Sequence, residues 1–216
     1  AESINPTLRF QQDPQHLEYN RLAHVILKEA YRRIGHPVDQ TGLTGLSSSQ
    51  HDGILIAPAS ATLDKGFIRI PVPIVKLKVF AYAHKSHENT RYEFGLLGNR
   101  ISIVQGMALV QKNMMGIVAL QLSSVNTSLK SIIRNQTDLV LLPEFYALSR
   151  SKKHLLEQTT ALQPAVYEIP MYHYISKENQ HLVSSIKQSL NKMKKLQLIS
   201  QVTQSYKKVL KADAEA

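Results

Sequence analysis

The sequence contains no cysteine, and no apolar run in it approaches the roughly 18 residues that a membrane-spanning helix requires. The lack of cysteine excludes disulfides, thiolate metal sites and a cysteine nucleophile. The chain also lacks a GxSxG elbow, a phosphate-binding P-loop and a dinucleotide-binding glycine fingerprint. We therefore predict a protein that is not an enzyme and that carries no cofactor.

Acidic residues are scarce, because 16 of them stand against 26 lysines and arginines, which gives a formal net charge of +10. Such a balance first raises nucleic acid as a partner. The basic residues are spread along the chain without interleaved aromatic residues or zinc-finger spacing, so we expect no nucleic-acid binding. An anionic ligand, or weak attraction to an anionic membrane surface, explains the charge equally well. The densest basic run, which we interpret as a solvated helix face, comprises Lys187, Lys192, Lys194, Lys195, Lys207, Lys208 and Lys211.

The histidine spacing predicts neither a metal site nor a catalytic triad. His84 and His87 lie in a polar connection without a third ligand nearby in the sequence. His51 and Asp52 follow a run of serines, but a triad needs its members to converge in space, and adjacent residues on a strand point apart. We therefore expect no metal.

The hydrophobic pattern predicts strands that alternate with helices, which is typical of an α/β fold with mainly parallel sheets. The clearest amphipathic helix covers residues 18–34, and Gly35 is its expected stop. Two prolines within residues 67–73 predict a strand at a sheet edge or between strands, followed by a separate strand over 77–83. Ser176 is expected to cap a long helix, and the tail 212–216 is expected to fray.

Residues 100–115 predict a strand, a tight glycine turn and a helix. Ile101, Ile103 and Val104 form a short apolar run, and Gly106 follows it directly. The first backbone N–H groups of a helix that starts in this way favour an anion. Every α/β protein has several such turns, so an ordinary connection and a ligand site both remain open.

Two strands, at 76–83 and 166–175, flank a middle block with its own strand–helix–strand rhythm. A chain that leaves one lobe, builds a second and returns forms two lobes with a cleft between them. Clefts of this kind bind small ligands by hinge closure. We expect lobe 1 to comprise residues 1–83 plus 171–216, and lobe 2 to comprise residues 84–170.

Several segments, taken in order, resemble the family 3 bacterial extracellular solute-binding proteins. The likeness spans nearly the whole chain, and its strength lies in the order and spacing of the segments. They are residues 30–38 (AYRRIGHPV), 52–53 (DG), 68–74 (IRIPVPI), 98–106 (GNRISIVQG), 137–142 (TDLVLL), 172–177 (YHYISK) and 181–183 (HLV).

This resemblance implies the fold of the type 2 periplasmic binding proteins, with two α/β lobes, two hinge strands and a solute in the interlobe cleft. It also implies secretion to the periplasm through a cleaved signal peptide, a monomer, and a membrane permease or sensor protein as partner. Amino-acid-binding members hold the ligand carboxylate with an arginine and with hydroxyl or N–H groups at helix starts. They hold the ligand amine with an acidic residue after the later buried strand.

The sequence departs from this family at three of those positions. Asp64 and Lys65 stand where the arginine is expected, and lysine does not reproduce the bidentate geometry of a guanidinium. Met107 stands where a serine or threonine is usual. Pro143 follows the later buried strand, and the acidic residue, Glu144, comes one place further on. The segment between Val38 and Asp52 is also short for the family.

The residues that we expect to bind a ligand are those at strand ends that face the cleft, with Arg69 as a further candidate for a ligand carboxylate or as a surface charge. Tyr82 and Tyr172 either line the cleft or pack at the hinge. The predicted function is a periplasmic solute receptor for a small polar ligand, anionic or amino-acid-like, which delivers it to an ABC importer or a membrane sensor. The alternative is a degenerate binding-protein scaffold that acts as a protein-interaction or signalling module. The full set of candidate ligand-binding residues is Asp13, Ser60, Lys65, Arg69, Gln105, Gly106, Met107 and Glu144.

Overall fold

The computed structural model describes residues 5–39, 51–61, 63, 65–92, 99–114 and 117–215, with side chains up to residue 213. Several parts of the sequence-based predictions lie outside the described residues. They are most of the segment between Val38 and Asp52, with its serine run at 47–49, and also Asp64, Gly98 and the end of the stretch 100–115.

The described strands form one seven-stranded sheet in the order β1-β2-β7-β3-β6-β4-β5. β1 runs parallel to β2, and β4 runs parallel to both β5 and β6, whereas β7 is antiparallel to β2 and β3 is antiparallel to β6. The predicted α/β fold is confirmed, but the sheet is mixed rather than mainly parallel. The strands are β1 (Phe10–Gln11), β2 (Gly53–Pro58), β3 (Phe67–His84), β4 (Ile101–Val104), β5 (Leu120–Leu122), β6 (Leu139–Pro143) and β7 (Thr159–Ser176).

Helices separate most of these strands. The α-helices are α1 (Leu17–Arg32), α2 (Ala108–Lys112), α3 (Val125–Ile133), α4 (Glu144–Arg150), α5 (Lys153–Leu156), α6 (Val183–Lys195) and α7 (Leu198–Glu215). The 3-10 helices are η1 (Pro14–His16), η3 (Lys85–His87) and η4 (Lys177–Leu182).

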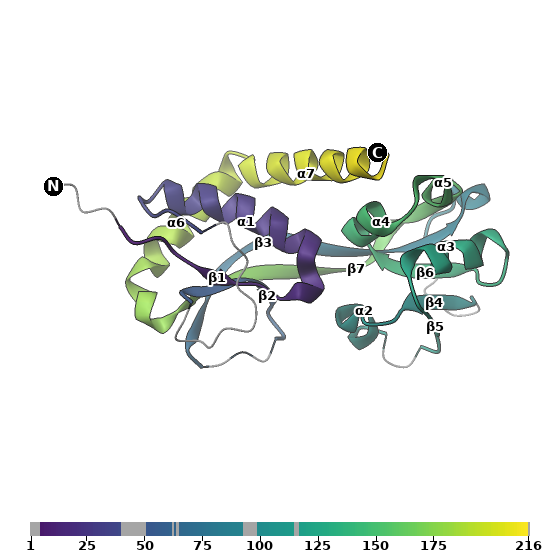
Figure 1. The fold of residues 1–216 in the computed structure, drawn as a ribbon, viewed down its shortest axis with the longest axis horizontal. Helices are drawn as coiled ribbons and strands as arrows, with labels where there is room; N and C mark the ends of the chain where they lie inside the picture. The colour runs from purple at the N-terminus through teal and green to yellow at the C-terminus, as the bar shows by residue number, and fades with distance from the viewer. Residues whose placement is uncertain are drawn as a thin grey trace. The chain divides into compact units, whose positions relative to one another are not determined.

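The chain divides into two compact units (Figure 1). Unit 1 comprises Ala1–Lys76 and Ile169–Tyr206, and unit 2 comprises Leu77–Glu168 and Lys207–Ala216. Three elements, β3, β7 and α7, therefore contribute residues to both units. The lobe limits expected from the sequence stay a prediction.

In unit 1, α1 packs against β2 and α6, and Figure 1 shows it running alongside β1 and β2. Leu22, Ile26 and Ala30, which recur at every fourth residue, are buried as the sequence predicted, whereas Val25 beside them is 50% exposed. Gly35 adopts a φ of +85° just beyond the helix, a left-handed conformation that glycine reaches without steric cost. The predicted helix and its stop are confirmed.

β3 is one continuous strand of 18 residues, where the sequence predicted two. Its ladder with β6 covers only Val79–Tyr82, so Pro71 and Pro73 lie outside it and remove no donor from that ladder. Prolines without a ladder partner on one side do not interrupt a strand, which explains why the two predicted segments join.

The position predicted for the helix start is confirmed, because Ser176 is the N-cap residue of the 3-10 helix η4, which leads directly into α6 at Val183. The predicted capping bond is wrong, since the Ser176 hydroxyl accepts from the Asn179 side chain at 2.9 Å and caps no backbone N–H. The prediction that residues 212–216 fray is also wrong in part, because α7 continues to Glu215.

In unit 2, α3 packs on β4, β5 and β6, and α4 packs on β6 (Figure 1). The Ser124 hydroxyl caps α3 by accepting from the Thr127 backbone N–H at 3.1 Å. Leu129 and Ile132 of α3 are buried against the strands, as are Val140 and Leu141 of β6. The core of unit 2 thus holds the ends of three parallel strands in fixed register.

Candidate functional site

The carboxyl ends of β5, β4 and β6 lie next to one another at one edge of unit 2. β4 is parallel to both neighbours, with Val104 opposite Leu122 and Ile103 opposite Leu141. Open α/β sheets bind ligands outside the carboxyl ends of parallel strands. Gln105, the first residue beyond β4, therefore comes to the same edge as Glu144, which follows β6.

Glu144 is engaged in an ion pair at this edge. Its carboxylate lies 2.8 Å from the Lys207 ammonium group of α7, and both side chains are 21% exposed. The hydroxyl of Tyr82 is buried nearby, and its pKa is raised mainly by that burial and further by the negative charge of Glu144. The carboxylate predicted to hold a ligand amine therefore already has a cationic partner.

Lys207 was missed by the sequence analysis. It stands in a lysine run that we interpreted as a solvated face, and that interpretation is wrong for Lys207. Its partner is 63 positions away (207 − 144), and no local spacing links the two residues.

The turn after β4 leaves few groups for a ligand. Gln105 and Gly106 are exposed, and Gly106 has a φ of +82° with open space where a side chain would start. Met107, by contrast, is only 8% exposed, and its side chain makes no capping bond to α2. α2 spans only five residues, so its macrodipole is weak. The Gln105 amide and the backbone of Gly106 are the exposed polar groups of the turn.

In unit 1, the end of β2 carries a second group of candidates. Ala57 pairs with Tyr172 of β7, and Ser60 stands exposed just beyond the strand. The guanidinium of Arg69, from β3, lies 5.0 Å from the centre of the Tyr172 ring, within the range of a cation–π contact. Arg69 is thus an exposed cation held beside the end of β2.

Tyr174 of β7 contacts the end of β2 near Arg69. Its hydroxyl donates to the Pro58 carbonyl oxygen at 3.3 Å, and its ring packs with Ile54 and Ala57 in a small apolar cluster. Burial raises the pKa of Tyr174, and the nearby charge of Arg69 partly offsets that rise. Tyr172, half-buried, packs against the same cluster.

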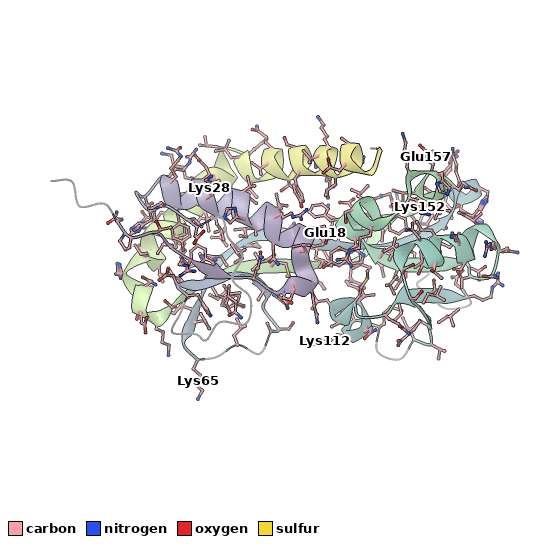
Figure 2. All side chains as sticks on the ribbon, in the orientation of Figure 1. Glu18, Lys28, Lys65, Lys112, Lys152 and Glu157 are labelled. Carbon is pink, nitrogen blue, oxygen red and sulfur yellow. The ribbon has the colours of Figure 1, made fainter. Side chains whose placement is uncertain are left out.

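Asp13 and Lys65 complete the candidates of unit 1. β1 and β2 are parallel, so Asp13 follows the end of β1 in the same direction as Ser60 follows β2. The Asp13 carboxylate accepts from the Gln15 backbone N–H at 2.9 Å and lies 3.7 Å from His16 Nε2. Lys65 is exposed, and Figure 2 shows its side chain pointing away from the protein.

The structure places these candidates without linking them directly. In the described part of the chain, no hydrogen bond or ion pair joins any two of Asp13, Ser60, Lys65 and Arg69. His16, next to Asp13, is buried, and burial lowers its pKa more than the nearby Asp13 carboxylate raises it.

A buried polar network in unit 1 also escaped the sequence analysis. The Tyr31 hydroxyl lies 2.7 Å from His173 Nε2, and His173 Nδ1 lies 2.8 Å from the Ile54 carbonyl oxygen. The carbonyl can only accept, so Nδ1 carries the proton and the Tyr31 hydroxyl donates to Nε2. Burial lowers the pKa of His173 to about 4. The network connects α1, β2 and β7, and its role is structural.

The described residues contain no group of three or more histidine, aspartate or glutamate side chains close enough to hold a metal ion. His84 instead accepts a hydrogen bond from the Ser86 backbone N–H at 3.1 Å. Across the same residues, none of the helices combines the length and the apolar character needed to span a bilayer.

No family model and no curated protein matches the sequence. Solved structures do. The GluR0 ligand binding core in complex with L-glutamate is 12% identical, with 94% of this chain and 98% of that chain covered and a TM-score of 0.63. The probable amino-acid ABC transporter extracellular-binding protein ytmK from Bacillus subtilis is 14% identical, with 93% and 97% covered and a TM-score of 0.63. A histidine kinase sensor domain with similarity to periplasmic binding proteins is 10% identical, with 95% and 97% covered and a TM-score of 0.60.

At identities of 10–14%, these likenesses define the fold and not the ligand. The resemblance noticed in the sequence is confirmed at that level: the chain has the fold of the periplasmic binding proteins.

Proposed function

We propose that this protein is a periplasmic solute-binding protein that closes its two lobes on a small polar ligand, anionic or amino-acid-like, and presents it to an ABC importer or a membrane sensor. The observation that carries the proposal is the fold, which is shared over 93–94% of the chain with structures whose names describe ligand binding. The two groups of polar residues at strand ends, one in each unit, support it.

Arg69 supports a ligand that carries a carboxylate. A guanidinium can bind a carboxylate through two parallel hydrogen bonds, and Arg69 is exposed beside the end of β2. In unit 2, the Gln105 amide and the N–H groups around Gly106 add donors. Both groups offer donors to oxygen atoms, which favours an anionic or zwitterionic solute.

A thermal-shift screen against amino acids, short peptides and organic anions tests the proposal. A ligand present at a hundred times its dissociation constant stabilises the folded protein by about 2.7 kcal/mol. Arg69→Met should abolish the shift caused by carboxylate ligands. Lys187→Met, which removes an exposed lysine from α6 in the same unit, is the matched control and should leave the shift unchanged.

An unchanged shift in Arg69→Met would remove Arg69 from the binding site but leave the receptor role standing. Absence of any stabilisation by any ligand of the screen would overturn the receptor role itself.

The alternative, a binding-protein scaffold that recognises another protein and no solute, is favoured by one observation. Two of the candidate residues already serve the fold, since Glu144 is paired with Lys207 and Met107 is buried. This function predicts no thermal shift with any small ligand, together with tight binding to a membrane sensor or an assembly partner.

A further inference from the structure

Exposed apolar side chains gather at one edge of the sheet in unit 2. The described residues include seven large hydrophobic side chains that are well exposed, and three of them lie within residues 117–120. Val118 is 94% exposed, Leu120 is 55% exposed and Ile117 is 36% exposed. Single exposed apolar residues are common, but a contiguous group marks a surface that another molecule covers.

The same residues lead into and begin β5, which is the last of the described strands on this side of the sheet. β5 pairs with β4 on one side, and Leu122 accepts from the Gln105 backbone N–H at 2.9 Å. In a parallel ladder, alternate residues of a strand direct both backbone groups to the same side. The backbone N–H and C=O groups of Leu120 and Leu122 therefore point towards β4, and those of Gln121 point away from it.

Among the described residues no strand pairs with this outer side of β5, and an edge of that kind is a template for a further strand. Peptides that add to a sheet edge gain affinity from main-chain hydrogen bonds and specificity from alternate side chains. Here the main-chain groups are those of Gln121, and the apolar side chains beside them are Val118 and Leu120.

The charge around this edge selects the partner. From Ile101 to Thr137 the sequence contains no acidic residue. Helix α3, which packs on β5, carries the exposed Lys130 and is followed by the exposed Arg134. A second copy of this chain would bring the same positive edge against itself, so charge disfavours self-pairing.

We propose that the β5 edge of unit 2 binds an extended segment of another protein, rich in alternating apolar and acidic residues, which adds as a strand beside Gln121. The apolar residues of the segment cover Val118 and Leu120, and its acidic residues face Lys130 and Arg134 of the neighbouring α3 region. This surface is the outer side of β5, whereas the residues of the proposed solute site in unit 2 follow the carboxyl ends of β4 and β6.

The test uses the whole chain and a blocked synthetic peptide of alternating valine and glutamate as the probe. Fluorescence anisotropy gives the affinity, and NMR shifts of the backbone amides of residues 117–122 give the location. Gln121→Pro removes the outward N–H and leaves the ladder with β4 in place, so it should weaken binding roughly tenfold. Gln121→Ala keeps that N–H and is the matched control, which should bind as the unaltered protein does.

A peptide with N-methyl groups on alternate amides needs no protein variant and should fail to bind, because it cannot form the main-chain ladder. Equal binding of that peptide, or of a peptide with lysine in place of glutamate, would overturn the proposal. So would a lack of amide shifts at residues 117–122. Concentration-dependent dimers that Gln121→Pro abolishes would assign the edge to a second copy instead. The solute screen on the same Gln121→Pro protein separates this result from the proposed receptor function.

Discussion

The Tyr31 hydroxyl donates a hydrogen bond of 2.7 Å to His173 Nε2 inside unit 1, where both side chains are fully buried. Phe10 packs edge-on against His173, with ring centres 4.7 Å apart. This bond ties α1 to β7 across residues that are 142 positions apart in the sequence. It is the single polar link that we expect to be most sensitive to substitution.

Tyr31→Phe should lower the free energy of unfolding by about 1 to 3 kcal/mol, because it leaves His173 Nε2 buried without a donor. Urea unfolding followed by circular dichroism measures the loss. The double variant Tyr31→Phe/His173→Phe removes both partners and should recover part of it. A double variant that loses the sum of the two single losses would show that the bond contributes nothing.

The neutral imidazole of His173 makes stability depend on pH. The folded pKa is lowered to about 4 from an ordinary value of 6.5, so between these values the unfolded chain binds a proton that the folded chain does not. The stabilisation is complete above pH 6.5 and is lost as the pH falls towards 4. The loss amounts to about 3 kcal/mol, since each pH unit corresponds to about 1.4 kcal/mol.

Urea unfolding at a series of pH values checks this, with His173→Gln as the comparison. Burial also lowers the pKa of His16. His16 therefore makes the free energy of unfolding fall with falling pH in both proteins. The difference between the two curves therefore isolates His173. Parallel curves would contradict the prediction.

Gly53→Ala should be among the most damaging small substitutions. A Cβ atom at Gly53 would lie 2.2 Å from the Tyr174 carbonyl oxygen and 3.1 Å from the Ile175 Cα atom, and backbone of a paired strand cannot move aside cheaply. We expect a loss of about 3 kcal/mol or more, since overpacking here displaces a strand. Thermal unfolding measures it.

Gly106→Ala is the matched comparison, because it tests conformation without a clash. Gly106 has a φ of +82° and no heavy atom near the added Cβ, so the cost should be only about 1 to 2 kcal/mol. A larger loss for Gly106→Ala than for Gly53→Ala would show that the contacts around Gly53 yield more easily than the structure indicates.

Lys207→Met should loosen the C-terminal part of α7. The ion pair with Glu144 is 2.8 Å long and only one-fifth exposed, so its loss should cost about 2 kcal/mol, between the values for surface and buried pairs. Hydrogen exchange at the amides of residues 207–213 should become faster. Lys208→Met, which changes the exposed neighbour, should leave that exchange unaltered.

The same variant probes the proposed site. Lys207→Met frees the Glu144 carboxylate, so a solute with an ammonium group should bind more tightly to it than to the unaltered protein. Unchanged affinity would place Glu144 outside the site.

The sequence predicted the elements that rest on local pattern. The repeat of Leu22, Ile26 and Ala30 identified α1, and the apolar run around Val140 identified β6, because period and burial are properties of a short window. The local pattern wrongly divided β3 into two strands, because the pairing of each residue with a neighbouring strand decides whether a proline is tolerated there. At Ser176 it gave the position of the helix start but not the capping bond, because the hydroxyl accepts from Asn179 instead.

The candidate site was predictable only in outline. Strand ends could be named from the sequence, and register then showed that Gln105 and Glu144 share an edge. The Glu144–Lys207 pair, the stacking of Arg69 on Tyr172 and the outward face of Gln121 all depend on contacts between distant segments. No spacing along the chain encodes those contacts.

Helix α7 has a consequence for how the protein is made. Unit 1 begins first on the ribosome, but it needs Ile169–Tyr206, which follow the long middle segment of unit 2. Unit 2 begins second, and its last segment starts at Lys207. That segment is synthesised only after all residues of unit 1 have been made. Neither unit is a contiguous stretch of chain, so unit 1 cannot finish folding until Tyr206 has been synthesised, and a nascent chain that stops short of Tyr206 leaves both units incomplete.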